Sequence, residues 1–235
     1  MNTEKLSERL ETVARFVPNG SKLADIGSDH AYLPCYLVKK GLVSFAVAGE
    51  VVLGPFESAQ GHVEEEGLSE KIMVRMGDGL DVIEPDEVNC ITIAGMGGGL
   101  ITSILERGKE KLGDIERLIL QPNISAVTIR KWLLENKWQL VEEEIMEEDG
   151  KIYEILVAEK GEPLKPYTIN LETELLLGPF LMKKQGEAFL KKWKMEAQIW
   201  QKILDQLENA APSTETTNKR QELLQMINKV EEVIK

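Results

Sequence analysis

The sequence predicts an α/β protein whose main domain is a mostly parallel, doubly wound sheet, followed by a smaller helical unit. Short runs rich in β-branched residues alternate with helix-length segments between residues 21 and 136, which is typical of repeated βαβ units. Two further β-rich runs flank Asp149-Gly150, a strong turn signal, so the sheet should end in an antiparallel hairpin. Beyond residue 166, apolar residues recur at spacings of three and four, which predicts long amphipathic helices.

The first domain is expected to begin with an amphipathic helix, because apolar residues recur at helical spacing from Leu6 and the pattern stops before Pro18. The strands that follow are expected at residues 23–26, 44–48, 71–75, 88–94, 116–120, 138–146 and 151–158. Helices are expected at residues 31–40, 54–66, 98–111 and 124–136. Because these helices lie between successive strands, the first five strands should pair in parallel.

A linker with Pro163 and Pro166 separates the two predicted domains, residues 1–160 and residues 167–235, since proline interrupts both helices and central strands. Residues 211–217 are interpreted as a loop between two helices, each with one narrow apolar stripe. The stripes consist of Phe189, Trp193, Ala197, Trp200, Leu204 and Leu207 and of Leu223, Ile227, Val230 and Ile234. We expect them to pair as an antiparallel hairpin that resembles a short coiled coil.

Length and composition exclude several classes of protein. The chain has 235 residues, 43% of them hydrophobic, which suits a globular protein with a sizeable core. No apolar run approaches the roughly 20 residues that a membrane span needs, and no secretory signal is visible, so we expect no membrane partner and a cytoplasmic protein. Cys35 and Cys90 are distant in sequence and the chain has only two histidines, so we expect no metal site and two reduced packing cysteines.

Charge is distributed unevenly along the chain. The net charge is −12, but residues 166–235 contain ten basic and ten acidic residues, so the whole acidic excess belongs to residues 1–165. Residues 180–202 carry a local net charge of +4. We expect this stretch to bind the phosphate backbone of a nucleic acid through Lys183, Lys184, Lys191, Lys192 and Lys194. The alternative is that these lysines only form the solvated face of a helix.

The turn after the first strand reads Asp25-Ile26-Gly27-Ser28-Asp29-His30. A dinucleotide site would have G-x-G-x-x-G at this point, whereas here a carboxylate, Asp29, occupies the place of the second glycine. A pyrophosphate would be repelled, which disfavours NAD and FAD. An acidic loop instead suits S-adenosylmethionine, which carries an ammonium and a sulfonium. The alternative for Asp29 is a helix cap.

Carboxylates also follow the next two strands. Glu50 ends the second strand, where an acidic residue can accept hydrogen bonds from both hydroxyls of a ribose. Asp78 follows the third strand between Gly77 and Gly79, where it could accept a hydrogen bond from the exocyclic amine of adenine. Each could be an ordinary surface residue or turn, but three carboxylates at the ends of three successive strands favour a shared ligand.

The ends of the fourth and fifth strands are also distinctive. Ala94-Gly95-Met96-Gly97-Gly98 is rich in glycine, which indicates a sharp turn or a close approach of the backbone to a ligand. Gln121-Pro122-Asn123 offers two side-chain amides that can contact the polar edge of a base, although a turn that ends in an Asn helix cap would explain the same residues.

In combination, these motifs resemble the bacterial tRNA (adenine-N1)-methyltransferase family that modifies adenosine 22 of tRNA. The resemblance rests on residues 25–34, Gly49-Glu50, Gly54-Pro55-Phe56, Gly77-Asp78-Gly79-Leu80, residues 94–98, residues 121–123 and residues 176–181. It implies a class I methyltransferase fold, tRNA as substrate and S-adenosylmethionine as cofactor. The expected cofactor contacts are Asp25, Gly27, Asp29, His30, Glu50, Gly77, Asp78, Gly79, Ala94, Gly95, Met96 and Gly97, and the base contacts are Gln121 and Asn123.

The reaction that this resemblance implies needs little acid–base chemistry. N1 of adenine has an in-plane lone pair, so the protein must mainly align the reactants and accommodate the positive charge that develops on the base. Asp29 is the expected catalytic residue. Two alternatives remain open at this point: a methyltransferase for small molecules, in which the helical hairpin is a lid or a dimerisation arm, and a non-catalytic partner protein that senses the cofactor.

Overall fold

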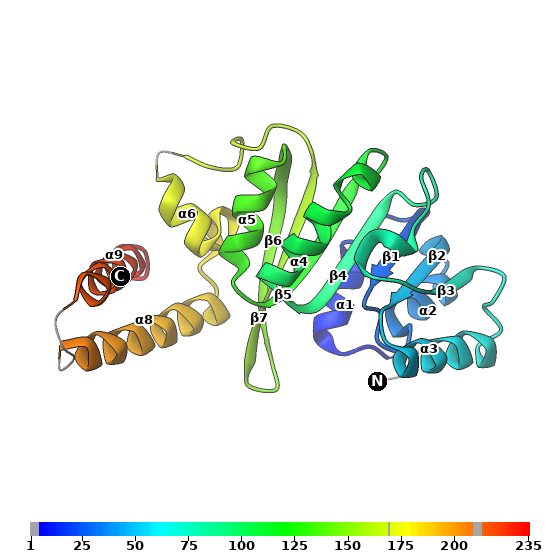
Figure 1. Ribbon diagram of the computed structural model, residues 1–235, viewed down its shortest axis with the longest axis horizontal. Coiled ribbons are helices and arrows are strands. Elements are labelled where there is room, and N and C mark those ends of the chain that lie inside the picture. The colour runs from blue at the N-terminus through cyan, green and yellow to red at the C-terminus, as the bar shows by residue number, and fades with distance from the viewer. Residues whose placement is uncertain (1–4, 169, 209–212) are drawn as a thin grey trace.

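A computed structural model describes residues 5–168, 170–208 and 213–235 (Figure 1). A seven-stranded sheet in the order β3-β2-β1-β4-β5-β7-β6 forms the centre of the protein. The strands from β3 to β5 pair in parallel, and β6 and β7 form the predicted antiparallel hairpin, in which β7 is the strand that also pairs antiparallel with β5. Their bounds are β1 Ser21–Ile26, β2 Val43–Glu50, β3 Ile72–Met76, β4 Cys90–Gly97, β5 Arg117–Ile124, β6 Trp138–Glu148 and β7 Lys151–Lys160.

Helices cover both faces of the sheet, because the central strands are apolar on both sides. In β1, Leu23 packs on one face while Ala24 packs on the other, and Ile119 and Leu120 of β5 divide in the same way. The helices α1, α2 and α3 contribute to the first of these two cores, and α4 and α5 to the second (Figure 1). Their bounds are α1 Glu8–Arg15, α2 Tyr32–Lys39, α3 Leu53–Glu65, α4 Gly98–Arg107 and α5 Ala126–Glu135.

The expected helix at residues 98–111 is divided in two. Helix α4 ends at Arg107, and a short 3-10 helix, η2 Lys109–Leu112, follows. Gly108 lies between them, and a Cβ there would come within 2.6 Å of the Leu80 Cβ. Leu80 belongs to a second 3-10 helix, η1 Gly79–Val82. The close packing of η1 against the chain at Gly108 therefore accounts for the break in the helix.

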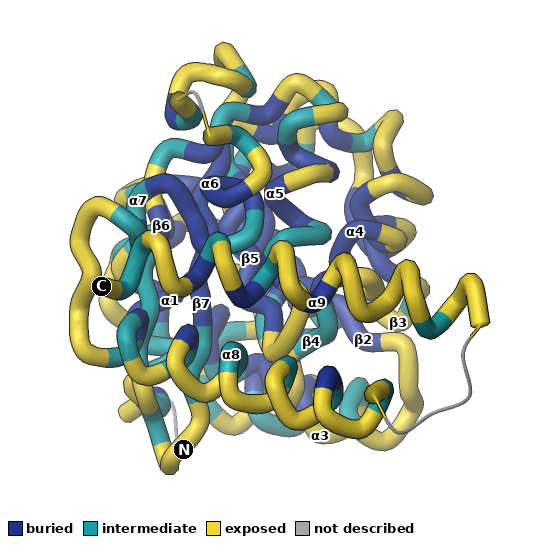
Figure 2. Tube along the Cα trace, turned by 90° about the vertical axis from the view of Figure 1, so that its left-hand side faces the viewer, coloured by how far each residue is buried: buried dark blue, intermediate teal, exposed yellow. Residues whose placement is uncertain are grey.

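The C-terminal part consists of α6 Leu171–Leu177, α7 Pro179–Lys184, α8 Glu187–Glu208 and α9 Thr214–Val233. The chain direction reverses between α8 and α9, and the predicted apolar stripes face each other in two clusters, one around Phe189, Trp193 and Val230 and one around Leu204, Leu223 and Ile227. We refer to α8 and α9 as the helical hairpin. The outer sides of both helices are exposed (Figure 2).

The predicted loop at residues 211–217 is wrong for its second half. Ser213 caps α9, because its hydroxyl accepts a hydrogen bond from the Thr216 backbone N–H and the Thr216 hydroxyl accepts one from the Ser213 N–H. This reciprocal cap makes Thr214–Thr217 helical, although three threonines in sequence suggested a loop. Residues 211 and 212 lie outside the described residues.

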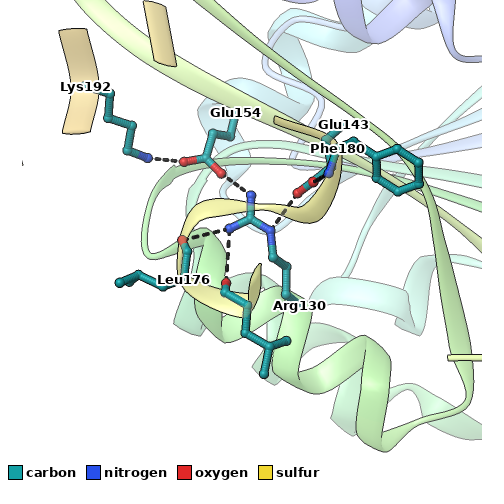
Figure 3. Close-up of polar contacts among 7 residues, drawn as sticks. Arg130, Glu143, Glu154, Leu176, Phe180 and Lys192 are labelled. Carbon is teal, nitrogen blue, oxygen red and sulfur yellow. Dashed lines mark hydrogen bonds and ion pairs between the residues drawn. The ribbon is translucent and has the colours of Figure 1, made fainter. Parts of the chain in front are cut away.

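Arg130 of α5 connects the C-terminal helices to the sheet (Figure 3). Its guanidinium is completely buried and donates hydrogen bonds to Glu143 of β6 (2.6 Å) and to Glu154 of β7. It also donates to the backbone carbonyls of Leu175 and Leu176, and the Lys192 ammonium of α8 binds Glu154 from the other side. We call Arg130, Glu143, Glu154 and Lys192 the buried ionic cluster.

The two carboxylates of the buried ionic cluster differ in their pKa. Burial would raise the pKa of both, and for Glu143 this effect exceeds the opposing influence of Arg130. For Glu154, the Lys192 ammonium and Arg130 together outweigh burial and hold its pKa below the usual value. The pKa of Arg130 is raised, since its two carboxylates outweigh burial. Lys192 thus completes the neutralisation of a cluster that would otherwise contain one cation and two carboxylates.

Two further observations concern possible membrane spans and the cysteines. No helix in the described ranges is long and apolar enough to span a membrane. Cys35 and Cys90 are free and buried, and burial raises the pKa of each thiol to about 12, which confirms them as packing residues. No group of three or more potential ligands for a metal ion occurs among the residues that the structure describes.

Gly178 provides a test of how the C-terminal helices are attached. It separates α6 from α7 with φ +92°, and a Cβ there would lie 2.7 Å from a guanidinium nitrogen of Arg130 and 2.8 Å from both Glu143 carboxylate oxygens. We expect Gly178→Ala to lower the free energy of unfolding by about 2 kcal/mol or more, through backbone strain and displacement of the ion pair. Urea unfolding measures the loss.

Gly186→Ala is the matched control, because Gly186 precedes α8 in the same part of the chain and a Cβ there would meet no atom within 4 Å. Equal midpoints for the two variants would contradict the attachment that we describe.

Candidate active site

A cavity of about 320 Å³ opens at the carboxyl ends of β1, β4 and β5. In open α/β sheets this edge is where ligands bind. Seven of the residues that the sequence singled out line the cavity, namely Asp25, Gly27, Asp29, Ala94, Gly95, Met96 and Asn123. The other lining residues are Arg9, Leu10, Ser28, Leu33 and Tyr153. The fold therefore brings the motifs after the first, fourth and fifth strands together around one space.

Asp25 organises the first loop of the site. Its buried carboxylate accepts one hydrogen bond from the Ser28 hydroxyl and one from the Thr92 hydroxyl, both at 2.6 Å. Burial raises the pKa of Asp25, and these two hydrogen bonds oppose the rise. Asp25 therefore connects the loop after β1 to the neighbouring strand β4, and its carboxylate oxygens already have partners within the protein.

Gly27 allows the same loop to approach β4 closely. Its φ is +69°, and a Cβ at this position would lie 2.3 Å from the Met96 side chain. Gly95, in the facing turn, has φ +80°. Both turns thus present bare backbone to the cavity, so a ligand could approach the main chain closely there.

Asp29, His30 and Ala31 form an unusual left-handed turn, with φ values of 45°, 69° and 56°. This conformation is unfavourable for residues other than glycine, so neighbouring groups must hold it. The Asp29 backbone N–H donates to Glu50, and the His30 ring contacts the Ser58 hydroxyl at 2.5 Å. In addition, the backbone carbonyl of His30 contacts a ring nitrogen of His62.

The helix-cap alternative for Asp29 does not fit this geometry. Ala31 occupies the N-cap position of α2, and no side chain there bonds to the start of the helix. The Asp29 side chain is 77% exposed and lies 3.5 Å from the His30 ring. The left-handed turn therefore directs a largely unshielded carboxylate to the rim of the cavity.

Glu50 lies beside this turn at the end of β2. It is only 6% exposed, and one of its carboxylate oxygens accepts the Asp29 N–H at 2.5 Å. Burial raises the pKa of Glu50, and this hydrogen bond opposes the rise. Among the described residues, none donates to its second carboxylate oxygen. A buried acceptor with spare capacity fits a ligand that brings hydroxyl donors, such as a ribose.

Residues 77–79, which follow β3, contact other parts of the protein and do not line the cavity. The carboxylate of Asp78 forms a two-pronged ion pair with Arg107 of α4, at 2.6 and 3.1 Å. The glycines beside it pack closely, since a Cβ at Gly77 would lie 2.9 Å from the Val82 side chain and one at Gly79 3.0 Å from Ile104. Because both partners of the ion pair are more than half exposed, the pair adds little stability and leaves Asp78 able to exchange partners.

Gln121 and Asn123, at the end of β5, differ in burial and in the hydrogen bonds that they form. The side-chain amide oxygen of Gln121, which is completely buried, accepts a hydrogen bond from the Gly95 backbone N–H at 3.0 Å. This bond holds the glycine-rich turn in place from the interior of the protein. The exposed Asn123 side chain donates to the Gly95 carbonyl at 2.7 Å and lines the cavity. Asn123 thus borders the space where a base would enter, whereas Gln121 shapes its wall.

Sequence reasoning missed Arg9 and Tyr153. The Arg9 guanidinium donates to the Gln121 side chain, lies 5.4 Å from the centre of the Tyr153 ring, and lines the cavity. Helix α1 was recognised by its apolar face, and Arg9 lies on its polar face, where a charge is ordinary. Only the packing of α1 against β7 brings this arginine to the site.

The five lysines that are predicted to bind phosphate differ in the contacts that they make within the protein. Lys184 and Lys191 pair with Glu144 and Glu147 of β6, at 3.4 and 2.6 Å, and Lys192 belongs to the buried ionic cluster. Lys183 lies over the ring of Phe180 at 5.6 Å. Lys194 is exposed and forms no ion pair with any of the described residues. The geometry thus favours a structural role for Lys192, whereas Lys183, Lys184, Lys191 and Lys194 remain exposed.

Comparison with known proteins gives a consistent result over the full length of the chain. The family model described as TrmK, tRNA (adenine(22)-N(1))-methyltransferase, matches residues 23–232. A Bacillus subtilis (strain 168) protein named tRNA (adenine(22)-N(1))-methyltransferase is 53% identical over 235 residues, which cover 100% of this chain and 99% of the relative.

Solved structures agree with the sequence comparison. The crystal structure of the B. subtilis tRNA methyltransferase TrmK has a TM-score of 0.96 and 52% identity, covering 99% of this chain and 100% of the other. A putative tRNA (m1A22) methyltransferase of Streptococcus pneumoniae, in complex with S-adenosyl-L-methionine, has a TM-score of 0.87 and 45% identity, covering 98% and 100%.

Glu50 and Asp29 are expected to respond differently to truncation. Glu50→Ala should weaken the binding of S-adenosylmethionine about tenfold or more, because a buried carboxylate acceptor is removed. Asp29→Ala should lower the rate of methyl transfer more than it weakens binding if the exposed Asp29 carboxylate stabilises charge that develops in the transition state. Calorimetric titration and single-turnover kinetics measure the two quantities. Equal effects of both variants on binding, with an unchanged rate for Asp29→Ala, would refute this division.

Proposed function

This chain belongs to the TrmK family of tRNA (adenine(22)-N(1))-methyltransferases, and we infer that it transfers the methyl group of S-adenosylmethionine to N1 of adenine 22 in tRNA. The observation that carries this inference is full-length identity of 53% to a named enzyme of this activity, combined with the cavity at the ends of β1, β4 and β5. The two alternatives, a small-molecule methyltransferase and a non-catalytic partner, gain no support from these relatives. Its place of action is then the cytoplasm, where tRNA is processed.

Residues that line the cavity, together with Glu50 and Asp78 at the ends of the next two strands, suit this cofactor. Glu50 would accept hydrogen bonds from the ribose hydroxyls, and Asp78 would accept one from the adenine amine after leaving Arg107. The bare backbone at Gly27 and Gly95 would lie against the amino acid part of the cofactor. Arg9 is the one arginine or lysine among the lining residues of the cavity, so it would pair with the cofactor carboxylate. When bound, S-adenosylmethionine supplies an electrophilic methyl group.

The chain's own residues provide alignment and charge. Asn123 borders the cavity at the end of β5 and would hold the Watson–Crick edge of the target adenine. Asp29, at the rim, would stabilise the positive charge that the base acquires, or accept the proton that the methylated base releases from N6. The surrounding strand ends keep these groups in place before the base arrives, so little reorganisation accompanies the reaction.

We propose a division of labour between the two predicted domains. Residues 1–160 would hold the cofactor and the target base, and residues 167–235 would hold the body of the tRNA. The first domain is acidic and repels a polyanion within the screening length of about 8 Å at physiological salt. The exposed lysines of α7 and α8 offset this repulsion where the helical hairpin extends from the sheet (Figure 1).

The proposed reaction can be tested directly. Incubation with unmodified tRNA and methyl-labelled S-adenosylmethionine should yield 1-methyladenosine at position 22, identified by nucleoside analysis and primer extension. A tRNA in which adenine 22 is replaced by guanine is the matched substrate control and should accept no label. Label in another nucleoside, or equal label in both tRNAs, would refute the assigned position.

The positive charge on α7 and α8 gives a second prediction. Replacing Lys183, Lys191 and Lys194 by Glu should weaken tRNA binding and reduce the slope of log affinity against log salt by about one for each phosphate that the protein no longer neutralises. Lys192 is left intact, because it belongs to the buried ionic cluster. Filter binding across a salt series measures both effects, and cofactor affinity should not change.

The control for this triple variant carries the same change in net charge on the first domain, at the exposed residues Lys71, Lys109 and Lys137. If the two triple variants bind tRNA equally well, the lysines of α7 and α8 have no specific role in tRNA binding.

A further inference from the structure

A second cavity, of about 350 Å³, lies between the sheet domain and the helical hairpin. One wall is residues 124–127, at the end of β5 and the start of α5, and the other includes Trp193 and Trp200 of α8. Ile124 directly follows Asn123, which lines the candidate active site, so the two cavities adjoin along the backbone. The Ile124 side chain is 70% exposed at this boundary.

The aromatic wall of this cavity can stack against a flat ring. Trp193 and Trp200 lie two helical turns apart on α8, with ring centres 6.2 Å apart and planes tilted by 52°. Trp200 is only half-buried, so part of its indole remains accessible from the cavity. Stacking on an aromatic side chain is how proteins hold an unpaired nucleobase, largely irrespective of its identity.

The polar groups of the cavity suit the edge of a base. Trp193 is 4% exposed, and its indole N–H has no acceptor within the described part of the chain, although a buried indole N–H ordinarily has one. The Lys192 ammonium and the Glu196 carboxylate also line the cavity. A base offers carbonyl and ring-nitrogen acceptors to the ammonium and an amino group to the carboxylate, whereas the Trp193 N–H is enclosed within the wall.

The same groups disfavour a phosphate as occupant. Two carboxylates, Glu154 and Glu196, line the cavity, and the one ammonium among its lining residues, Lys192, is already paired with Glu154. An anion would therefore meet net negative charge at close range, whereas a neutral base would not. The lining thus distinguishes a base from the tRNA backbone.

We propose that this cavity receives a second nucleobase of the tRNA, the one that faces the target adenine in the folded substrate. This inference rests on the proposed function. N1 belongs to the pairing edge of adenine, so the target must leave its stack before methylation, at a cost of a few kcal/mol. The base that faces it is then left without its partner, and an aromatic pocket next to the active site would stabilise that opened state.

Four variants test the proposal. Val127→Phe fills the cavity from the α5 side without removing any aromatic ring, and Trp200→Ala removes a stacking surface; each should weaken tRNA binding about tenfold, in line with the effect of removing one stacked base. Trp200→Phe should retain most of the affinity. Ile199→Ala is the matched control, since Ile199 is an exposed neighbour on α8 that does not line the cavity.

A modified substrate identifies the base. With a tRNA that carries an abasic nucleotide opposite adenine 22, Trp200→Ala should bind as tightly as wild-type protein, because the base that would stack on Trp200 is already absent. Calorimetric titration with S-adenosylmethionine should give wild-type affinity for every variant, which confirms a folded sheet domain, and wild-type helix content by circular dichroism confirms the helical hairpin, because Trp200 also packs between α8 and α9. If Trp200→Ala does not retain wild-type affinity for S-adenosylmethionine, the tRNA affinity of Val127→Phe decides whether the cavity binds a base.

The outcomes separate this inference from the proposed function. If wild-type protein methylates adenine 22 but Val127→Phe binds tRNA as tightly as wild type, the second base site is refuted and the function stands. If wild-type protein forms no 1-methyladenosine at that position, the proposed function itself fails. Full additivity of Trp200→Ala with the abasic substrate would also overturn the site.

Discussion

The arrangement of the whole molecule depends on one buried guanidinium. Arg130 joins α5, both strands of the terminal β-hairpin and the end of α6, and through Glu154 it also reaches Lys192 of α8. Arginine remains charged under all ordinary conditions, so burial cannot be relieved by loss of a proton, and each of its donors needs an acceptor in fixed geometry. Apolar packing alone would allow the C-terminal helices to slide on β6. The ionic cluster permits one placement, and that placement forms the wall of the second cavity.

A different kind of constraint shapes the active site. The left-handed turn at Asp29, His30 and Ala31 is unfavourable in itself and is held by contacts to β2 and α3, including the hydrogen bond from Asp29 to Glu50. This hydrogen bond joins two acidic residues in different environments. Glu50 is buried, and one of its carboxylate oxygens receives no hydrogen bond from the described residues, whereas the Asp29 side chain is exposed at the rim of the cavity. The local strain is concentrated where ligand contacts are expected, as is common at functional sites.

Much of this structure could be predicted from the sequence, because the signals were local. The alternation of strands and helices predicted the parallel part of the sheet, the Asp149-Gly150 turn signal predicted its antiparallel end, and the residues that follow the first, fourth and fifth strands predicted where the cavity lies. The missed features depend on contacts between distant segments. Arg130 looks like a surface residue of an amphipathic helix, Arg9 like one of α1, and nothing near Lys192 in sequence indicates Glu154 as its partner. Gly178 is likewise explained only by the charges that it faces.

The position of β7 between β5 and β6 has a consequence for how the chain folds during synthesis. The first five strands and their helices can assemble while later residues are still within the ribosome, since N-terminal parts fold first. Until residue 160 has emerged, however, β5 remains an open edge, and exposed edges invite pairing with other chains. Closing that edge brings Glu143 and Glu154 to Arg130, and α8 then adds Lys192. The order of translation thus makes docking of the C-terminal helices the last step, after the two carboxylate acceptors for the guanidinium are already in place.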